Sequence, residues 1–180
     1  MERHAKRPID QSLEAWLKAT GSLTARLRLL ENTHVKVIRQ ESLLLLPHEQ
    51  VDLHCISGHV REVMIFVNYV PAVWARSATP SNALHGAWKA LAELGIRPLA
   101  EFCFRSPVSA EHLCTLSTYS PTVYWNAESI PFGPTSMVLG PMQHYRDGGR
   151  SSAFFIEEQT LRVFEAFAPW IGTLPQRNYL

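Results

Sequence analysis

Two helical patterns open the chain. In the first, large apolar residues recur at helical spacing, at Leu13, Trp16 and Leu17. Asp10 or Ser12 can cap this helix, and Gly21 breaks it. Ser22 then supplies a cap for a second helical segment, over residues 23–30. The spacing predicts two short helices before the first strand.

The patterns that follow are extended. Residues 34–41 alternate between the two faces of a strand. Residues 60–67 and 72–79 are rich in β-branched and aromatic side chains, and they flank a turn at residues 68–71. Two such runs around a short turn are typical of a β-hairpin.

A helical spacing returns after this hairpin. Apolar residues recur at i, i+4, i+7 and i+10, at Leu84, Trp88, Leu91 and Leu94. Gly95 stands where a helix commonly ends in a left-handed residue, and Pro98 follows just beyond. The pattern predicts a helix over residues 82–94, and residues 100–104 then favour another strand.

The last patterned region predicts a second hairpin. Residues 151–156 and 161–168 flank a polar turn at residues 157–159, whereas residues 117–147 have no clear period. Hairpins join the strands, and the helices come in blocks and do not alternate with strands. This order favours an antiparallel α+β domain over a βαβ fold.

Composition fits one domain. The chain has 180 residues, of which 46% are hydrophobic and 18% charged. This length is close to that of a single domain, so we expect residues 1–180 to fold around one core. Seventeen Lys and Arg residues against 16 Asp and Glu leave a net charge of +1. Such a balance gives no field to attract nucleic acid or an acidic membrane, and a monomer is the default expectation.

No targeting or membrane-spanning pattern is seen in the sequence. The basic residues 1–10 are not followed by the apolar region of a secretory signal. The longest apolar stretch, 63–75, is interrupted by Asn68 and Pro71 and is far shorter than the ~20 residues that span a bilayer. We expect a soluble cytoplasmic protein with no stable membrane insertion.

Common cofactor motifs are also missing. The sequence has no Gly-x-Gly-x-x-Gly, Walker loop, His-Glu-x-x-His or Gly-x-Ser-x-Gly pattern. Its three cysteines, Cys55, Cys103 and Cys114, form no Cys-x-x-Cys pair, and its eight histidines are scattered. We therefore expect neither a metal ion nor a nucleotide or flavin cofactor.

Charged residues within apolar strand segments are the unusual feature. Arg61 and Glu62 enter the predicted first hairpin, Arg76 lies on its second strand, and Glu165 lies between Phe164 and Ala166. Taken singly, each is expected to point to the solvent side of a half-buried sheet. Because neighbours on a strand face opposite ways, one of Arg61 and Glu62 is expected to face solvent.

At these residues the chain resembles the chorismate pyruvate-lyase family, which makes 4-hydroxybenzoate in the first step of bacterial ubiquinone synthesis. The order and spacing of several short segments carry the resemblance: residues 21–27, 60–63, 74–77 with Pro80, 94–99, and 163–167 with Pro169. The resemblance implies the family fold. That fold is a single six-stranded antiparallel sheet with helices packed on it, and a ligand cavity enclosed beneath helical flaps.

The resemblance also assigns site residues. The family's substrate arginine falls on Arg61 and its substrate glutamate on Glu165, while two contacts made largely through the main chain fall on Leu23 and Leu99. A second family arginine falls on Arg76, a candidate for the enolpyruvyl carboxylate or for the path by which ligands enter or leave. Chorismate is a dicarboxylate, and a guanidinium matches a carboxylate with two parallel hydrogen bonds.

The implied reaction removes pyruvate from chorismate and leaves an aromatic ring that keeps its hydroxyl group. Glu165 would act as the acid or base near the breaking bond, and its apolar neighbours would favour the neutral form. Two alternatives stay open. One is a non-catalytic small-molecule sensor domain with the same fold, and the other is a lyase acting on a related enolpyruvyl compound.

Overall fold

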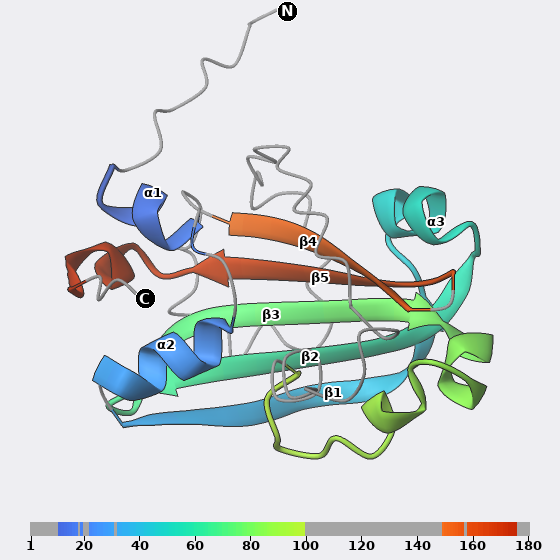
Figure 1. The fold of residues 1–180 in the computed structure, drawn as a ribbon, viewed down its shortest axis with the longest axis horizontal. Helices are drawn as coiled ribbons and strands as arrows, with labels where there is room; N and C mark the ends of the chain where they lie inside the picture. Colours follow the sequence, from blue (N-terminus) through green and yellow to red (C-terminus); the bar gives the residue numbers. More distant parts are fainter. Residues whose placement is uncertain are drawn as a thin grey trace, which may run out of the picture.

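The fold is centred on one antiparallel sheet. The computed structural model describes residues 11–99 and 149–175, except residues 18, 20, 21, 31 and 157. Within these residues five strands pair in the order β1-β2-β3-β5-β4 (Figure 1). Their bounds are Thr33–Leu44 for β1, Ser57–Val67 for β2, Val70–Pro80 for β3, Gly149–Ile156 for β4 and Gln159–Phe167 for β5. The antiparallel α+β class is thus confirmed, whereas the strand predicted at 100–104 and the unpatterned stretch 117–147 lie outside the described residues.

Both predicted hairpins are confirmed, with tighter turns than expected. β2 and β3 are joined at Asn68 and Tyr69, which both have positive φ, 49° and 64°. Two successive left-handed residues match the right-handed twist of the flanking strands, and asparagine tolerates this conformation better than most residues. In the second hairpin Ile156 already pairs with Gln159. Each connection therefore holds its strands in a fixed register.

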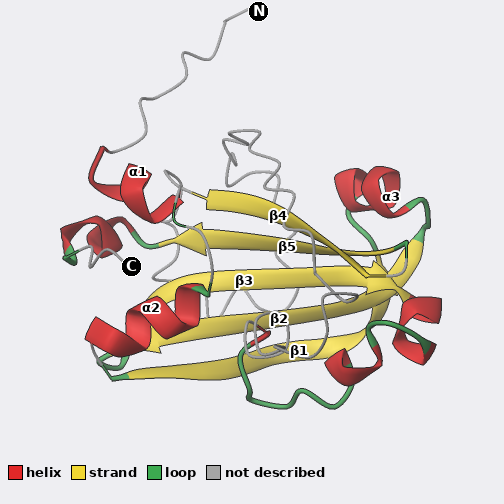
Figure 2. Ribbon diagram, viewed as in Figure 1, coloured by secondary structure: helices red, strands yellow, loops and turns green. Residues whose placement is uncertain are grey.

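The two N-terminal helices are confirmed as α1, Gln11–Leu17, and α2, Leu23–Leu30. Ser22 caps α2, because its Oγ accepts a hydrogen bond from the Ala25 amide at 3.1 Å. A third helix, α3, spans Pro47–Leu53 and has no counterpart among the predicted elements. Figure 2 shows these helices at the ends of the sheet.

The helix predicted over residues 82–94 is wrong. Two 3₁₀ segments, η1 (Ser81–His85) and η2 (Lys89–Leu91), occupy this stretch. Gly86 separates them with φ −131° and ψ −126°, which are not helical angles. The predicted apolar set is nevertheless buried, since Trp88, Leu91 and Leu94 are all less than 5% exposed. The apolar spacing identified what is buried but not the backbone that buries it.

Contacts with β5 explain this difference. The side chain of Gln159 accepts the Ala87 amide at 3.1 Å, and the Gln159 carbonyl accepts the Trp88 indole N–H at 3.0 Å. These two bonds hold the main chain of Ala87 and the indole ring of Trp88 against β5. Tertiary hydrogen bonds of this kind outweigh the weak intrinsic preference for an α-helix.

Strand register decides which side chains share a face of the sheet. Arg61 lies opposite Ser77, and Glu62 lies opposite Arg76. Successive side chains of a strand point to opposite faces. Arg61 and Ser77 therefore share one face, called here the first face, and Glu62 and Arg76 share the second face.

Both faces of the sheet are buried. On the first face one apolar cluster packs under α1, α2 and η6 (Pro169–Thr173), and another packs under η1 and η2. Figure 1 shows α2 lying across one end of β2 and β3. The second face holds a cluster that includes Met64, Trp74 and Phe164, and a smaller cluster that includes Leu53 of α3. Polar side chains in mid-strand are consequently enclosed between apolar clusters.

Candidate functional site

Arg61, in the middle of β2, is a buried cation without a counter-ion in the described part of the chain. It is only 3% exposed. Its Nη2 donates to the carbonyls of Gly95 and Arg97 at 2.9 and 3.1 Å. Its Nε is buried and has no hydrogen-bond partner among the residues that the structure describes. Burial lowers the pKa of Arg61 to about 10, so its charge is held at a cost that an anionic ligand would remove.

The loop before Leu99 is shaped to hold this guanidinium. Gly95 has φ +56°, the left-handed conformation predicted for it, and this turn brings two main-chain carbonyls to Arg61. Gln40 of β1 fixes the start of the same loop, since its Nε2 donates to the carbonyls of Leu91 and Ala92, both at 3.0 Å. Main-chain carbonyls thus orient the guanidinium without supplying a counter-charge.

Glu165 of β5 lies on the same face and has a cationic neighbour of its own. Across the strand pair it faces Arg150 of β4, whose Nε donates to Glu165 Oε2. The side chains are 16% exposed for Arg150 and 14% for Glu165. The sheet thus gives Glu165 a cationic partner on the neighbouring strand. Its Oε1 makes no hydrogen bond within the residues that the structure describes.

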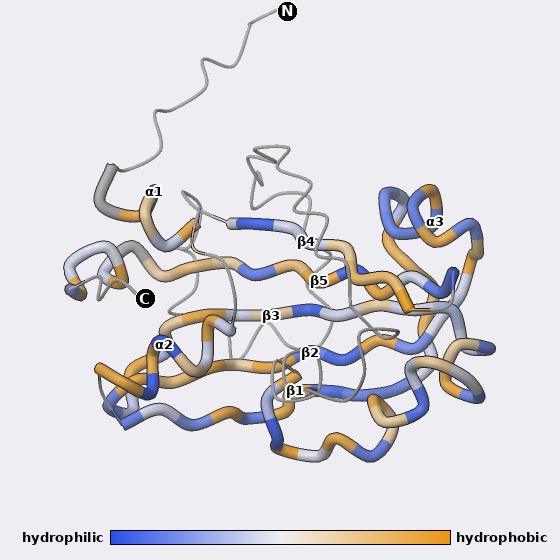
Figure 3. Tube along the Cα trace, in the orientation of Figure 1, coloured by the Kyte–Doolittle hydropathy of each residue, from blue (hydrophilic) through white to orange (hydrophobic). Residues whose placement is uncertain are grey.

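Small side chains separate the two charged positions. On β3, Ser77 lies between Arg61 and Val163, and Ala75 lies between Val63 and Glu165. Arg61 and Glu165 are therefore two strand spacings apart across the sheet and two residues apart along it, about 12 Å in all. Only a serine and an alanine side chain lie between them on the intervening strand. Figure 3 shows the hydrophilic positions in the middle of β2, β3 and β5. The arrangement suits a small ligand with an anionic end near Arg61 and a polar group near Glu165.

The two residues expected to contact substrate through the main chain lie in the apolar clusters of this first face. Leu23 is the first residue of α2, is 3% exposed and belongs to the cluster under α1 and α2. Leu99 packs against the other cluster, under η1 and η2. Leu23, Leu99, Arg61 and Glu165 therefore share one face, with the charged side chains between the apolar ones.

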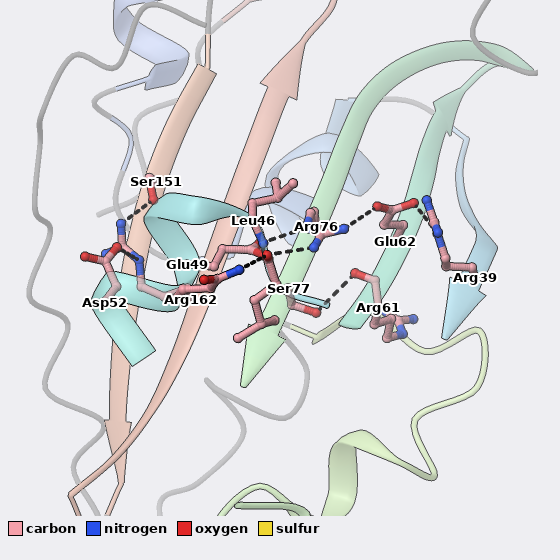
Figure 4. Close-up of polar contacts among 12 residues, drawn as sticks. Arg39, Leu46, Glu49, Asp52, Arg61, Glu62, Arg76, Ser77, Ser151 and Arg162 are labelled. Carbon is pink, nitrogen blue, oxygen red and sulfur yellow. Dashed lines mark hydrogen bonds and ion pairs between the residues drawn. The ribbon is translucent and has the colours of Figure 1, made fainter. Parts of the chain in front are cut away.

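Arg76 is not part of this group. It lies on the second face, where its Nε and Nη2 donate to the two carboxylate oxygens of Glu49 at 2.7 and 2.8 Å. Its Nη1 donates to Glu62 Oε1 at 2.7 Å, and Arg39 donates to the other oxygen of Glu62 at 2.9 Å (Figure 4). Burial alone would lower the pKa of Arg76, but the hydrogen bonds and charges of these glutamates raise it. All three of its nitrogens are engaged with carboxylates of the protein.

The expectation that one of Arg61 and Glu62 faces solvent is wrong. Their exposed fractions are 3% and 4%, because both faces of the sheet are covered at this row. The same correction applies to Arg76, which is 6% exposed. Buried charges need partners. Glu62 and Arg76 have them on the second face, whereas Arg61 has only main-chain carbonyls among the described residues.

Two polar residues of the first face were not identified from the sequence. Arg150 is found only through the register of the second hairpin, which places it opposite Glu165. His59 lies two residues before Arg61 on the same strand face, is 9% exposed, and its Nε2 is buried with no hydrogen-bond partner among the described residues. Burial and the charge of Arg61 lower the pKa of His59. Strand alternation from Arg61 would have pointed to His59 as a neighbour.

Two kinds of structure were not found among the described residues. No helix there is long and apolar enough to cross a membrane. No group of three or more His, Cys, Asp and Glu side chains in the same residues could hold a metal ion.

Comparison with known families gives a consistent match. The sequence model of the family described as chorismate lyase matches residues 7–124. The protein named Probable chorismate pyruvate-lyase in Bordetella pertussis is 31% identical over 170 residues, which cover 92% of this chain and 86% of that protein. Proteins of the same name in Aromatoleum aromaticum and Methylococcus capsulatus are 31% and 33% identical, covering 97% and 91% of this chain and 96% and 99% of those proteins.

Solved structures give a weaker match. A GntR-family transcriptional regulator from Bacillus cereus aligns with a TM-score of 0.46 and 8% identity, over 82% of this chain and 98% of that one. The C-terminal domain of the histidine utilization repressor from Pseudomonas syringae pv. tomato aligns with a TM-score of 0.41 and 10% identity, over 83% and 100%. Scores this low support no conclusion about the function of this chain.

Proposed function

Because this chain belongs to the chorismate lyase family, we propose that it eliminates pyruvate from chorismate and releases 4-hydroxybenzoate. The observation that carries the proposal is the buried Arg61, which has no carboxylate partner among the described residues and lies on the same sheet face as Glu165. A guanidinium in this state gains most from a carboxylate ligand, since the ligand supplies the missing counter-charge. Chorismate and 4-hydroxybenzoate both carry a ring carboxylate.

Binding would align the ring between the two charged residues. In the proposed complex Arg61 Nε donates to the ring carboxylate, and the ring lies over Ala75 and Ser77. Leu23 and Leu99 contact the substrate from the two apolar clusters, largely through their main chains. Holding a flexible substrate in one reactive conformation is a large part of the catalytic effect.

The proposed reaction breaks the ether bond between a ring carbon and the enolpyruvyl group. The neighbouring ring carbon loses a hydrogen, and pyruvate carries the corresponding hydrogen in its methyl group. The ring becomes aromatic and keeps its hydroxyl group, so the atoms balance with no oxidant, reductant or water. Glu165 would accept a hydrogen bond from that hydroxyl through Oε1 and orient the carbon that loses its hydrogen.

Arg76 receives a different role in this proposal. Its three nitrogens are already bound to Glu49 and Glu62 on the second face, so none is left for the enolpyruvyl carboxylate. We assign it to the stability of the sheet. This assignment replaces its candidacy as a second carboxylate ligand, and the enolpyruvyl carboxylate has no assigned partner among the described residues.

The biological setting follows from the family. We propose that the enzyme works as a monomer in the cytoplasm and that its 4-hydroxybenzoate enters ubiquinone synthesis. Expression in a bacterium that lacks its own chorismate lyase tests this part. Restored ubiquinone content supports it, and unchanged content with active protein in the extract contradicts it.

The reaction itself is tested by incubating purified protein with chorismate. We expect 4-hydroxybenzoate, followed by absorbance and chromatography, and pyruvate, followed with a coupled dehydrogenase, in equal amounts. Arg61→Ala and Glu165→Ala should each lose activity while staying folded, and Arg28→Ala, at an exposed position of α2, serves as a control.

Three results would contradict the proposal in different ways. Folded wild-type protein that binds 4-hydroxybenzoate but leaves chorismate unchanged would indicate a sensor domain. A different aromatic product with pyruvate would indicate a lyase for a related compound. Full activity in Arg61→Ala would contradict the proposed binding site.

A further inference from the structure

We propose that Arg150 is a positioning residue that orients Glu165 and connects it to the main chain between α1 and α2. The inference rests on the proposed function, because it concerns how Glu165 is presented to the substrate. In this proposal Arg150 does not contact the substrate ring. It acts through Glu165 alone.

The contact between Arg150 and Glu165 uses only one carboxylate oxygen. Arg150 Nε donates to Glu165 Oε2, and no hydrogen bond to Oε1 is present within the described residues. A bond to one oxygen restrains the direction of the carboxylate and leaves the other oxygen for a ligand. Both side chains are mostly buried, at 16% and 14% exposed, so solvent screens this ion pair only partly.

Two more contacts fix the guanidinium itself. Arg150 Nη1 donates to the carbonyl of Ala19, in the connection between α1 and α2. Its guanidinium carbon lies 5.8 Å from the centre of the Phe167 ring, within the range of a cation–π contact. Three contacts from three directions leave the guanidinium little freedom.

The Ala19 contact links the acid or base to the segment that carries Leu23. Ala19 is joined to the end of α1 by a 3.4 Å hydrogen bond from its amide to the Trp16 carbonyl. Leu23, the first residue of α2, follows four residues later. Glu165 is therefore oriented fully only when Ala19 holds its contact with Arg150. The geometry therefore couples the position of Leu23 to the orientation of Glu165, and both residues are expected substrate contacts.

Arginine suits this role better than lysine. Its nitrogens lie in one rigid plane, so Nε and Nη1 can bind two acceptors on different elements at the same time. A lysine at position 150 would keep the charge next to Glu165 but has a single nitrogen on a flexible stem. We therefore expect Arg150→Lys to keep part of the contribution that Arg150 makes to activity, and Arg150→Ala to keep none of that contribution.

A double-mutant cycle tests the proposal. Arg150→Ala is expected to lower kcat/KM for chorismate about 100-fold, mainly through kcat, as a small misplacement of a catalytic group can. In a Glu165→Gln background the same change should cost less than about threefold, because the group that Arg150 positions is already impaired. Arg150→Lys should lie between wild type and Arg150→Ala. Equal losses in both backgrounds would overturn the proposal, since Arg150 would then act independently of Glu165.

Arg162→Ala is the matched control. Arg162 lies on the same hairpin but points to the second face, where its Nε pairs with Asp52 at 3.0 Å. Its side chain is 15% exposed, close to the 16% of Arg150, so its removal causes a comparable loss of packing. We expect a similar fall in Tm with kcat/KM unchanged within about threefold. An equal loss of activity in Arg162→Ala would reduce Arg150 to a structural role and overturn the proposal.

Binding measurements separate this inference from the proposed reaction. The four proteins of the cycle are wild type, Arg150→Ala, Glu165→Gln and the double variant. Each is titrated with 4-hydroxybenzoate by calorimetry. If wild type does not turn chorismate over, the proposed function fails, and non-additive losses of affinity in the cycle would still support the role of Arg150. Additive losses would overturn it. Wild-type protein that neither reacts nor binds would overturn both. If Arg150→Ala does not fold, Arg150→Gln replaces it in the cycle.

Discussion

Arg61 and Arg76 lie one register position apart on the paired strands β2 and β3, and they point to opposite faces of the sheet. Both are buried, at 3% and 6% exposed. Arg76 binds two carboxylates of the protein, whereas Arg61 has none among the described residues (Figure 4). Two similar side chains in neighbouring positions therefore receive different proposed roles, Arg76 in the stability of the sheet and Arg61 in ligand binding.

Replacing Arg61 should separate stability from function. Arg61→Met removes a buried charge that has no counter-ion in the described ranges of the chain, and it keeps a side chain of similar length. The freed carbonyls belong to the exposed residues Gly95 and Arg97, which water can reach. We expect the free energy of unfolding to rise by about 1–2 kcal/mol in urea titrations. The Tm increase that 4-hydroxybenzoate gives to wild type should disappear. A destabilised variant that still binds the ligand would contradict this account.

Replacing Arg76 should have the opposite effect on stability. Arg76→Met leaves the carboxylates of Glu49 and Glu62 buried without their main partner, which typically costs about 3–5 kcal/mol. Urea unfolding followed by circular dichroism measures the loss. Adding Glu49→Gln to this variant should restore part of the stability, because it removes one of the stranded charges. No restoration would show that the network is not the cause.

Stability should fall in mild acid. Burial lowers the pKa of His48, and burial together with the charge of Arg61 lowers the pKa of His59, both below the ordinary 6.5. Between 6.5 and the lower folded values the unfolded chain binds more protons, so the free energy of unfolding decreases as pH falls through this window. At pH 7 and above the contribution is fully present. Thermal unfolding between pH 5 and 8 measures the slope, which His59→Phe should reduce.

The turn that holds Arg61 should be sensitive to backbone conformation alone. At Gly95, φ is +56° and an added Cβ would meet no atom within 4 Å. Gly95→Ala therefore costs about 1–2 kcal/mol through left-handed strain and not through a clash. We expect weaker 4-hydroxybenzoate binding in calorimetry, because the carbonyls that orient Arg61 shift. Gly95→Asn, which tolerates this conformation better, should bind nearly as wild type does. Equal effects of Ala and Asn would argue against a conformational cause.

Local patterns were sufficient for most of the secondary structure. The two hairpins, the two N-terminal helices and the Ser22 cap depend on residues close in sequence, so the sequence predicts them correctly. Residues 82–94 were predicted wrongly, because Gln159, more than sixty residues away, fixes that segment in 3₁₀ turns. The short helix α3 was missed; its carboxylate Glu49 caps the Leu46 amide at 2.9 Å and also binds Arg76.

The sequence by itself determined the antiparallel class, the strand alternation and the family resemblance that singles out Arg61 and Glu165. Only the tertiary structure decided which buried charges have partners. Strand alternation fixes that Arg61 and Glu62 point oppositely, but it does not reveal that both faces are covered. Whether a buried charge is neutralised depends on an opposite charge brought from another element. Glu49 of α3 neutralises Arg76 in this way, and Arg150 of β4 neutralises Glu165. Such pairings arise from strand register and helix docking, which act between residues distant in the chain.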